Sequence, residues 1–113
     1  MAMIQAQVGP DTDLGAAAGL FHGFGDRSRL ALLTHLALGE HRVVDLTGHL
    51  GLAQSTVSKH LACLLDLGLV TVRAEGRASV YALAHPAATL DLLAGAERLL
   101  GLTGGTDPHE DHR

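Results

Sequence analysis

Residues 42–81 constrain the fold more than any other part of this chain. Within them Val57, Leu61 and Leu64 recur at the spacing i, i+4, i+7, which places them along one side of a helix. The positions between them are mostly small and polar, whereas an ordinary solvent-facing helix is rich in Glu, Lys and Arg. The pattern therefore predicts a helix over residues 54–67 that buries one side and offers the other to base edges and phosphates.

Shorter elements flank this helix on both sides. A helix is predicted over residues 43–50, and Gly51 supplies the turn that joins it to the next helix. Two β segments, 69–74 and 78–83, follow around a turn at Glu75 and Gly76. Helix, turn, helix and a basic hairpin together are typical of DNA-binding winged helix-turn-helix domains.

The remaining apolar patterns predict three more helices. They cover residues 13–24, about 28–39 and 87–102, the last with Pro86 in its first turn. The predicted fold class is mainly α (α+β), with the order helix, helix, helix, helix, strand, strand, helix. One domain, 12–102, is expected between a flexible tail at 1–11 and a flexible His- and acid-rich tail at 103–113.

Three motifs resemble the ArsR/SmtB family of bacterial winged-helix regulators. They are GDRSRLALLTHL (25–36), VVDLTGHLGLAQSTVSKHLACLLDLGLV (43–70) and EGRASVYAL (75–83), within a match over roughly residues 13–102. Asp26 and Arg29 match the aspartate-x-x-arginine that opens the second helix of the family. The resemblance implies a homodimer that binds a double-stranded DNA operator and controls transcription, in many members in response to metals.

The residues expected to contact DNA lie on the predicted helix 54–67, called the reading helix below, on the hairpin and just before residue 43. For His60 the alternative to a DNA contact is packing between helices, and for Arg77 it is an exposed charge without a partner. Arg29 is expected to fix a helix start. The net charge of −4 is unusual for a DNA-binding protein, but residues 26–81 hold six cations and five anions. The expected contacts are Gln54, Ser55, Thr56, Ser58, Lys59, His60, Arg73, Arg77 and Arg42.

The first and last helices are apolar on more than one face. A small core with a hairpin cannot bury all of that surface, so a self-complementary dimer interface is expected there. The alternative is that both helices pack on their own core. The expected interface residues are Leu14, Ala17, Phe21, Leu90, Leu93 and Leu100.

Metal ligands cannot be assigned from the family patterns. The positions that the resemblance aligns with its metal sites hold Arg42 and Val44, Cys63 and Leu67, or His85 followed by non-ligating residues. No cofactor is required on this basis, and any binding of Ni²⁺, Zn²⁺ or Co²⁺ is expected to be weak. Input from a second effector protein is the competing prediction, beside direct metal sensing through His and acidic ligands. The candidate ligands are His85, His109, His112 and Cys63.

Other classes of protein find little support. Residues 1–13 lack the features of a signal peptide, no apolar run is long enough to span a membrane, and one cysteine fits a reducing cytoplasm. No phosphate loop, HExxH or Gly-x-Ser-x-Gly motif occurs, so the chain is not expected to be an enzyme. A winged helix that binds proteins without DNA is the remaining alternative.

Overall fold

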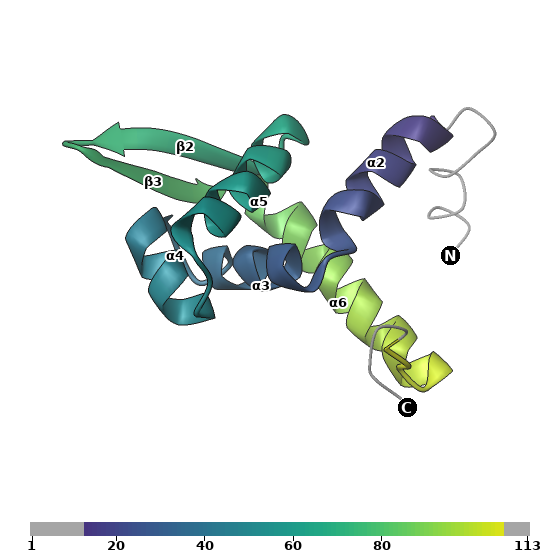
Figure 1. Cartoon of the computed structure of the whole chain (residues 1–113). Coiled ribbons are helices and arrows are strands. Elements are labelled where there is room, and N and C mark those ends of the chain that lie inside the picture. Colours follow the sequence, from purple (N-terminus) through teal and green to yellow (C-terminus); the bar gives the residue numbers. More distant parts are fainter. Residues whose placement is uncertain (1–12, 108–113) are drawn as a thin grey trace.

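The computed structural model describes residues 13–107 and has the predicted winged helix-turn-helix fold (Figure 1). The β2–β3 hairpin projects to one side of the central helices, and α2 and α6 extend toward the other. In chain order the elements are α2 (Leu14–Phe24), α3 (Arg27–Leu36), β1 (His41–Arg42), α4 (Val43–Leu50), α5 (Gln54–Asp66), β2 (Val70–Glu75), β3 (Ala78–Leu83) and α6 (Pro86–Thr103).

Local capping explains where the first helices begin. The carboxylate of Asp13 accepts a hydrogen bond from the Ala16 amide at 3.0 Å, and that of Asp26 accepts one from the Arg29 amide at 3.0 Å. Each aspartate satisfies a backbone donor that has no partner inside its helix. Gly51 ends α4 in the left-handed region at φ 67°, which allows the tight turn into α5.

Strand β1 was not predicted from the sequence. His41 and Arg42 pair with Tyr81 and Val80 of β3, so the sheet has the order β1-β3-β2. The structure therefore adds one short strand to the expected order of elements. A strand of two residues is too short to show alternating polarity, and Arg42 also serves as the residue that precedes α4.

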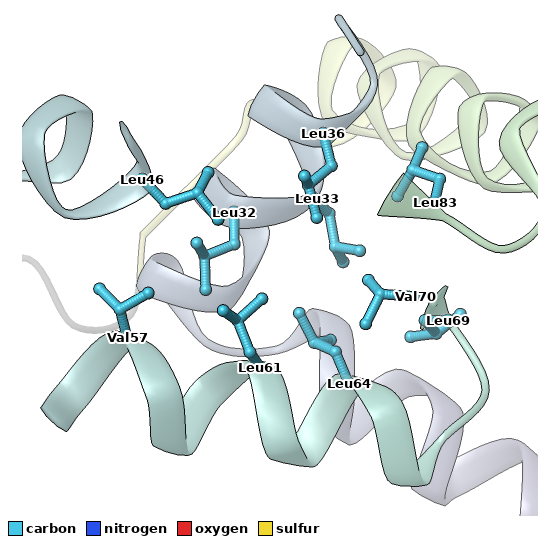
Figure 2. Packing of buried hydrophobic residues seen from close by; sticks show 10 residues of the cluster. All are labelled: Leu32, Leu33, Leu36, Leu46, Val57, Leu61, Leu64, Leu69, Val70 and Leu83. Carbon is cyan, nitrogen blue, oxygen red and sulfur yellow. The ribbon is translucent and has the colours of Figure 1, made fainter. Parts of the chain in front are cut away.

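The hydrophobic core lies where α3, α4 and α5 meet the base of the hairpin (Figure 2). Leu61 and Leu64 point from α5 toward Leu32 and Leu33 of α3, and all four side chains are completely buried. Leu30, also on α3, is 37% exposed and lies outside the core cluster. The whole cluster contains Leu32, Leu33, Leu36, Leu46, Val57, Leu61, Leu64, Leu69, Val70 and Leu83.

Helices α2 and α6 contribute little to this core. Gly23 is the one buried residue of α2, where it lies against Leu67 and Leu69 with no room for a Cβ atom. Thr89 is the one buried residue among the 18 of α6. Both helices therefore leave most of their apolar surface uncovered in the single chain. None of the helices within residues 13–107 is long and apolar enough to cross a membrane.

The predicted tails are largely outside the described residues. This applies to segment 1–11 and to the His- and acid-rich end from residue 108 onward. Helix α6 ends at Thr103, one residue beyond the predicted domain boundary, and Gly104 follows it with φ 91°.

Candidate nucleic-acid interface

Helix α5 presents the two sides that its sequence predicts. Val57, Leu61 and Leu64 are buried, and they point from one side of α5 into the core (Figure 2). The other side carries five exposed polar residues, which burial of the apolar stripe holds toward solvent. They are Gln54, Ser55, Thr56, Ser58 and Lys59.

The hydroxyl groups near the start of α5 do not cap the helix. The residue before the first turn is Ala53, which provides no side-chain hydrogen bond. Within residues 13–107 the side chains of Ser55, Thr56 and Ser58 form no hydrogen bond. Their donors and acceptors therefore remain available to an external partner such as a base edge.

The side chain of His60, on α5, lies against the start of α3. Its Nε2 atom is 3.8 Å from the Asp26 carboxylate, and its Nδ1 atom is 3.4 Å from the Arg29 guanidinium. The side chain is 19% exposed. The structure thus places His60 in the helix-packing position that was the alternative to a DNA contact.

Asp26 is the centre of this junction. The hydrogen bond from the Arg29 amide is the main cause that lowers the pKa of its carboxyl group. The charges of Arg29 and His60 act in the same direction, and partial burial opposes them. The capped start of α3 and the middle of α5 therefore meet at one ionised carboxylate.

Arg29 links α3 to the end of α2. Its guanidinium donates hydrogen bonds to the carbonyl oxygens of His22 at 2.8 Å and Gly23 at 3.1 Å. These carbonyls lie in the last turn of α2, where carbonyl oxygens have no backbone donor within the helix. The expectation that Arg29 fixes local structure agrees with this placement. Arg27 in turn forms an ion pair with Asp107 at 2.6 Å.

The hairpin cations differ in their surroundings. Arg73 is 2.7 Å from the Glu40 carboxylate and 3.4 Å from that of Glu75. Hydrogen bonding to Glu40 is the main cause that raises the pKa of Arg73. Arg77 is exposed at the tip of the hairpin and, like Lys59, forms no ion pair within the described part of the chain. No local sequence pattern indicates the contact between Arg73 and Glu40, because these residues are 33 positions apart.

Arg42 lies at the start of α4 beside the hairpin. Its amide donates to Asp45 at 3.4 Å, and its guanidinium Nε is 3.8 Å from the same carboxylate. Just over half of the Arg42 side chain is exposed. The guanidinium is therefore only loosely engaged and remains open to solvent.

Within the described residues no metal site forms around the candidate ligands. Cys63 is half-buried on α5, and His85 is exposed at the start of α6, where it lines a small apolar pocket of about 190 Å³. His109 and His112 lie outside the described residues. Over residues 13–107, no group of three or more His, Cys, Asp or Glu side chains is arranged as a site for a metal ion.

Comparison with known proteins gives a consistent result. The model of the family described as bacterial regulatory protein, arsR family, matches residues 26–72, which run from the start of α3 into the hairpin. A probable mercury resistance operon repressor of Streptomyces lividans is 36% identical over 68% of this chain and 62% of its own length. The chain thus spans less than two thirds of this curated relative.

Solved structures extend the similarity to nearly all of the described residues. HlyU from Vibrio cholerae is 31% identical, with a TM-score of 0.65 over 82% of this chain and 97% of that one. Mb0332 from Mycobacterium bovis is a homodimeric winged helix-turn-helix DNA-binding domain and a possible ArsR-family transcriptional regulator. It is 25% identical, with a TM-score of 0.71 over 94% of this chain and 100% of that fragment.

Replacement of Asp26 tests the junction between α3 and α5. We expect Asp26→Ala to lower the free energy of unfolding at neutral pH by about 1 kcal/mol, because it removes the cap of α3. Folding lowers the pKa of this carboxyl group, so its contribution is present above the unfolded value of about 3.9 and is lost as the pH falls through the folded value. Urea unfolding at several pH values should show the difference from wild type shrinking below about pH 4.

Asp66→Ala is the matched control for this measurement. Asp66 is exposed at the end of α5 and has no hydrogen bond or ion pair within residues 13–107, so its loss should change stability by no more than about 0.5 kcal/mol. An Asp26→Ala variant as stable as wild type at neutral pH would contradict the structural role of the carboxylate.

Proposed function

Because this chain belongs to the ArsR family of bacterial regulatory proteins, we propose that it is a dimeric transcription regulator that binds operator DNA. The observation that carries this proposal is the exposed side of α5. Its polar side chains are held outward by a fully buried stripe, and those of Ser55, Thr56 and Ser58 make no hydrogen bond within residues 13–107. The family is one of regulatory proteins, in agreement with the prediction that the chain is not an enzyme.

In the proposed complex α5 enters the major groove. The groove is about 12 Å wide and accepts one helix, whose side chains then reach base edges. Thr56 and Ser58 are proposed to read bases, whereas Lys59 and Arg77 are proposed to contact phosphates. Arg42, at the start of α4, is a further proposed phosphate contact. His60 is proposed to stabilise α5 through its contacts with Asp26 and Arg29.

Few cations are free to contribute to this binding. The Arg29 guanidinium donates hydrogen bonds to two backbone carbonyls, and that of Arg73 forms ion pairs with two carboxylates. We therefore expect modest non-specific affinity for DNA and a shallow dependence on salt, with specificity coming from α5. A protein-binding module without DNA affinity is the alternative outcome of the tests below.

Dimerisation is proposed through α2 and α6. Leu14 is 77% exposed, Phe21 57% and Leu100 52%, and these helices bury one residue each. A second copy would cover this surface on both chains at once, as an isologous interface requires. The homodimeric state of the Mycobacterium bovis domain supports this arrangement. The two α5 helices of the dimer would then contact two half-sites of the operator.

A metal ion is proposed as the regulatory input. The Streptomyces lividans relative is named as a probable mercury resistance operon repressor, which supports metal-responsive control in this part of the family. Input from a second effector protein stays a prediction, with no feature of residues 13–107 in its favour. Control of transcription would place the protein in the bacterial cytoplasm, where the operator is.

The reading helix is tested by a double variant, Thr56→Ala with Ser58→Ala. Operator fragments are first selected from random DNA with the wild-type protein, and affinities are then measured by fluorescence anisotropy. Each lost base contact should cost on the order of 1–3 kcal/mol, with little change in binding to unrelated DNA. The control is Thr34→Ala, which removes an exposed hydroxyl from α3. Equal operator affinity in the folded double variant and in wild type would remove α5 from the proposed interface.

Glu40 should restrain DNA binding by the hairpin. We expect Glu40→Gln to raise affinity for all DNA sequences, because it releases Arg73 toward phosphates, and to steepen the plot of log affinity against log salt by up to about one unit. Glu97→Gln removes the same charge from α6 and serves as the control. Equal effects of the two variants would mean that net charge alone is responsible.

Leu100→Glu tests the dimer interface. A carboxylate placed on this apolar surface should convert the protein to a monomer at micromolar concentration, since an unpaired charge is costly to bury. Sedimentation velocity measures the mass directly. Leu38→Glu, at a leucine that is 84% exposed just after α3, should leave the dimer intact. A wild-type protein that sediments as a monomer would contradict the proposed assembly.

A further inference from the structure

Three histidine rings, from α3, β1 and α4, lie close together. His49 of α4 lies between the other two: its ring centroid is 5.1 Å from that of His35, near the end of α3, and 5.5 Å from that of His41, in β1. His35 and His41 are half-buried, and His49 is exposed. No sequence motif points to these residues, which are six and eight positions apart.

Backbone carbonyls fix the tautomer of two of the rings. The Nδ1 atom of His35 is 3.0 Å from the Ala31 oxygen, and that of His41 is 2.8 Å from the Gly39 oxygen. A carbonyl oxygen only accepts, so each Nδ1 carries the hydrogen, and in the neutral ring the lone pair is on Nε2. Histidines that bind metals are held by the same kind of second hydrogen bond.

We propose that His35, His41 and His49 form a binding site for a divalent transition-metal ion that prefers imidazole, such as Zn²⁺, Ni²⁺ or Co²⁺. Rings that share one such ion at metal–nitrogen distances of about 2.1 Å have centroids roughly 5 Å apart. The separations from His49 to His35 and to His41, 5.1 and 5.5 Å, are close to this value. Three imidazoles leave the fourth position to water or another ligand.

The site requires one side chain to reorient. The His49 ring is inclined at 45° to that of His35 and at 74° to that of His41, and within residues 13–107 the three side chains do not form a preformed metal site. His49 forms no hydrogen bond within the described residues and is exposed. Its ring rotates about a soft terminal torsion, whereas the other two rings are already oriented.

Occupancy of this site would act on the elements that face DNA. The ion would join the end of α3 to α4, the first helix of the helix-turn-helix, and to β1, which pairs with β3 of the hairpin. This consequence rests on the proposed function, but metal binding itself does not depend on DNA. The tail histidines and Cys63 take no part in the site.

Calorimetric titration of Ni²⁺, Zn²⁺ and Co²⁺ into the full chain tests the proposal, with the visible spectrum of Co²⁺ as a second signal. Wild type and a His109→Gln, His112→Gln double variant should bind one ion per chain with equal affinity. His49→Gln should weaken binding at least about tenfold, because loss of a ligand costs no less than loss of its supporting contacts. His22→Gln, at an exposed histidine of α2, is the matched control and should bind as wild type does.

A second variant and a separate measurement make the test decisive. His41→Gln removes a ligand from a different element and should weaken binding as His49→Gln does, even if one of the variants folds poorly. Unchanged affinity in both, or loss of binding only in the tail variant, would overturn the site. DNA binding without metal should be the same in His49→Gln and wild type. If wild type binds metal as expected but no DNA, the proposed function fails and the site stands.

Discussion

Burial of one side of α5 is the constraint on which the rest of the structure depends. Leu61 and Leu64 have no exposed surface and point toward Leu32 and Leu33 across the core (Figure 2). Removal of such a side chain leaves a cavity and costs about 2–5 kcal/mol, a large part of the stability of a small domain. Because the stripe cannot rotate away from the core, the polar side of α5 has one possible direction. The surface proposed to read DNA is therefore set by hydrophobic packing.

Polar contacts secure this helix against its neighbours. Asp26 caps α3 and faces His60 of α5, while Arg29 reaches the final carbonyls of α2. Three helices thus share one small network next to the core. The network engages Arg29 and also His60, which is among the expected DNA contacts, and Glu40 engages a further expected contact, Arg73. The charge available to phosphates is smaller than the composition indicates, which puts more weight on shape and direct base contacts in α5.

The sequence predicts the elements whose signals are local. The i, i+4, i+7 spacing identifies the buried stripe of α5, and Gly51 identifies the turn before it, since both follow from backbone geometry within one or two turns of helix. It does not predict β1, which has two residues and gains its pairing from β3. The Glu40–Arg73 ion pair and the histidine cluster were also missed. Each joins side chains from different elements, so it exists only after the chain has folded.

The most exposed apolar surface and the proposed reading surface lie on different parts of the fold. Helices α2 and α6 extend away from the β2–β3 hairpin (Figure 1), and each buries a single residue. A partner copy seated on these helices would leave α5 and the hairpin uncovered. The chain can therefore use its apolar surface for assembly without losing any of the side chains proposed to meet DNA. The histidine cluster joins α3, β1 and α4, so an ion bound there would act on α4, the first helix of the helix-turn-helix, and on β1, which pairs with the hairpin.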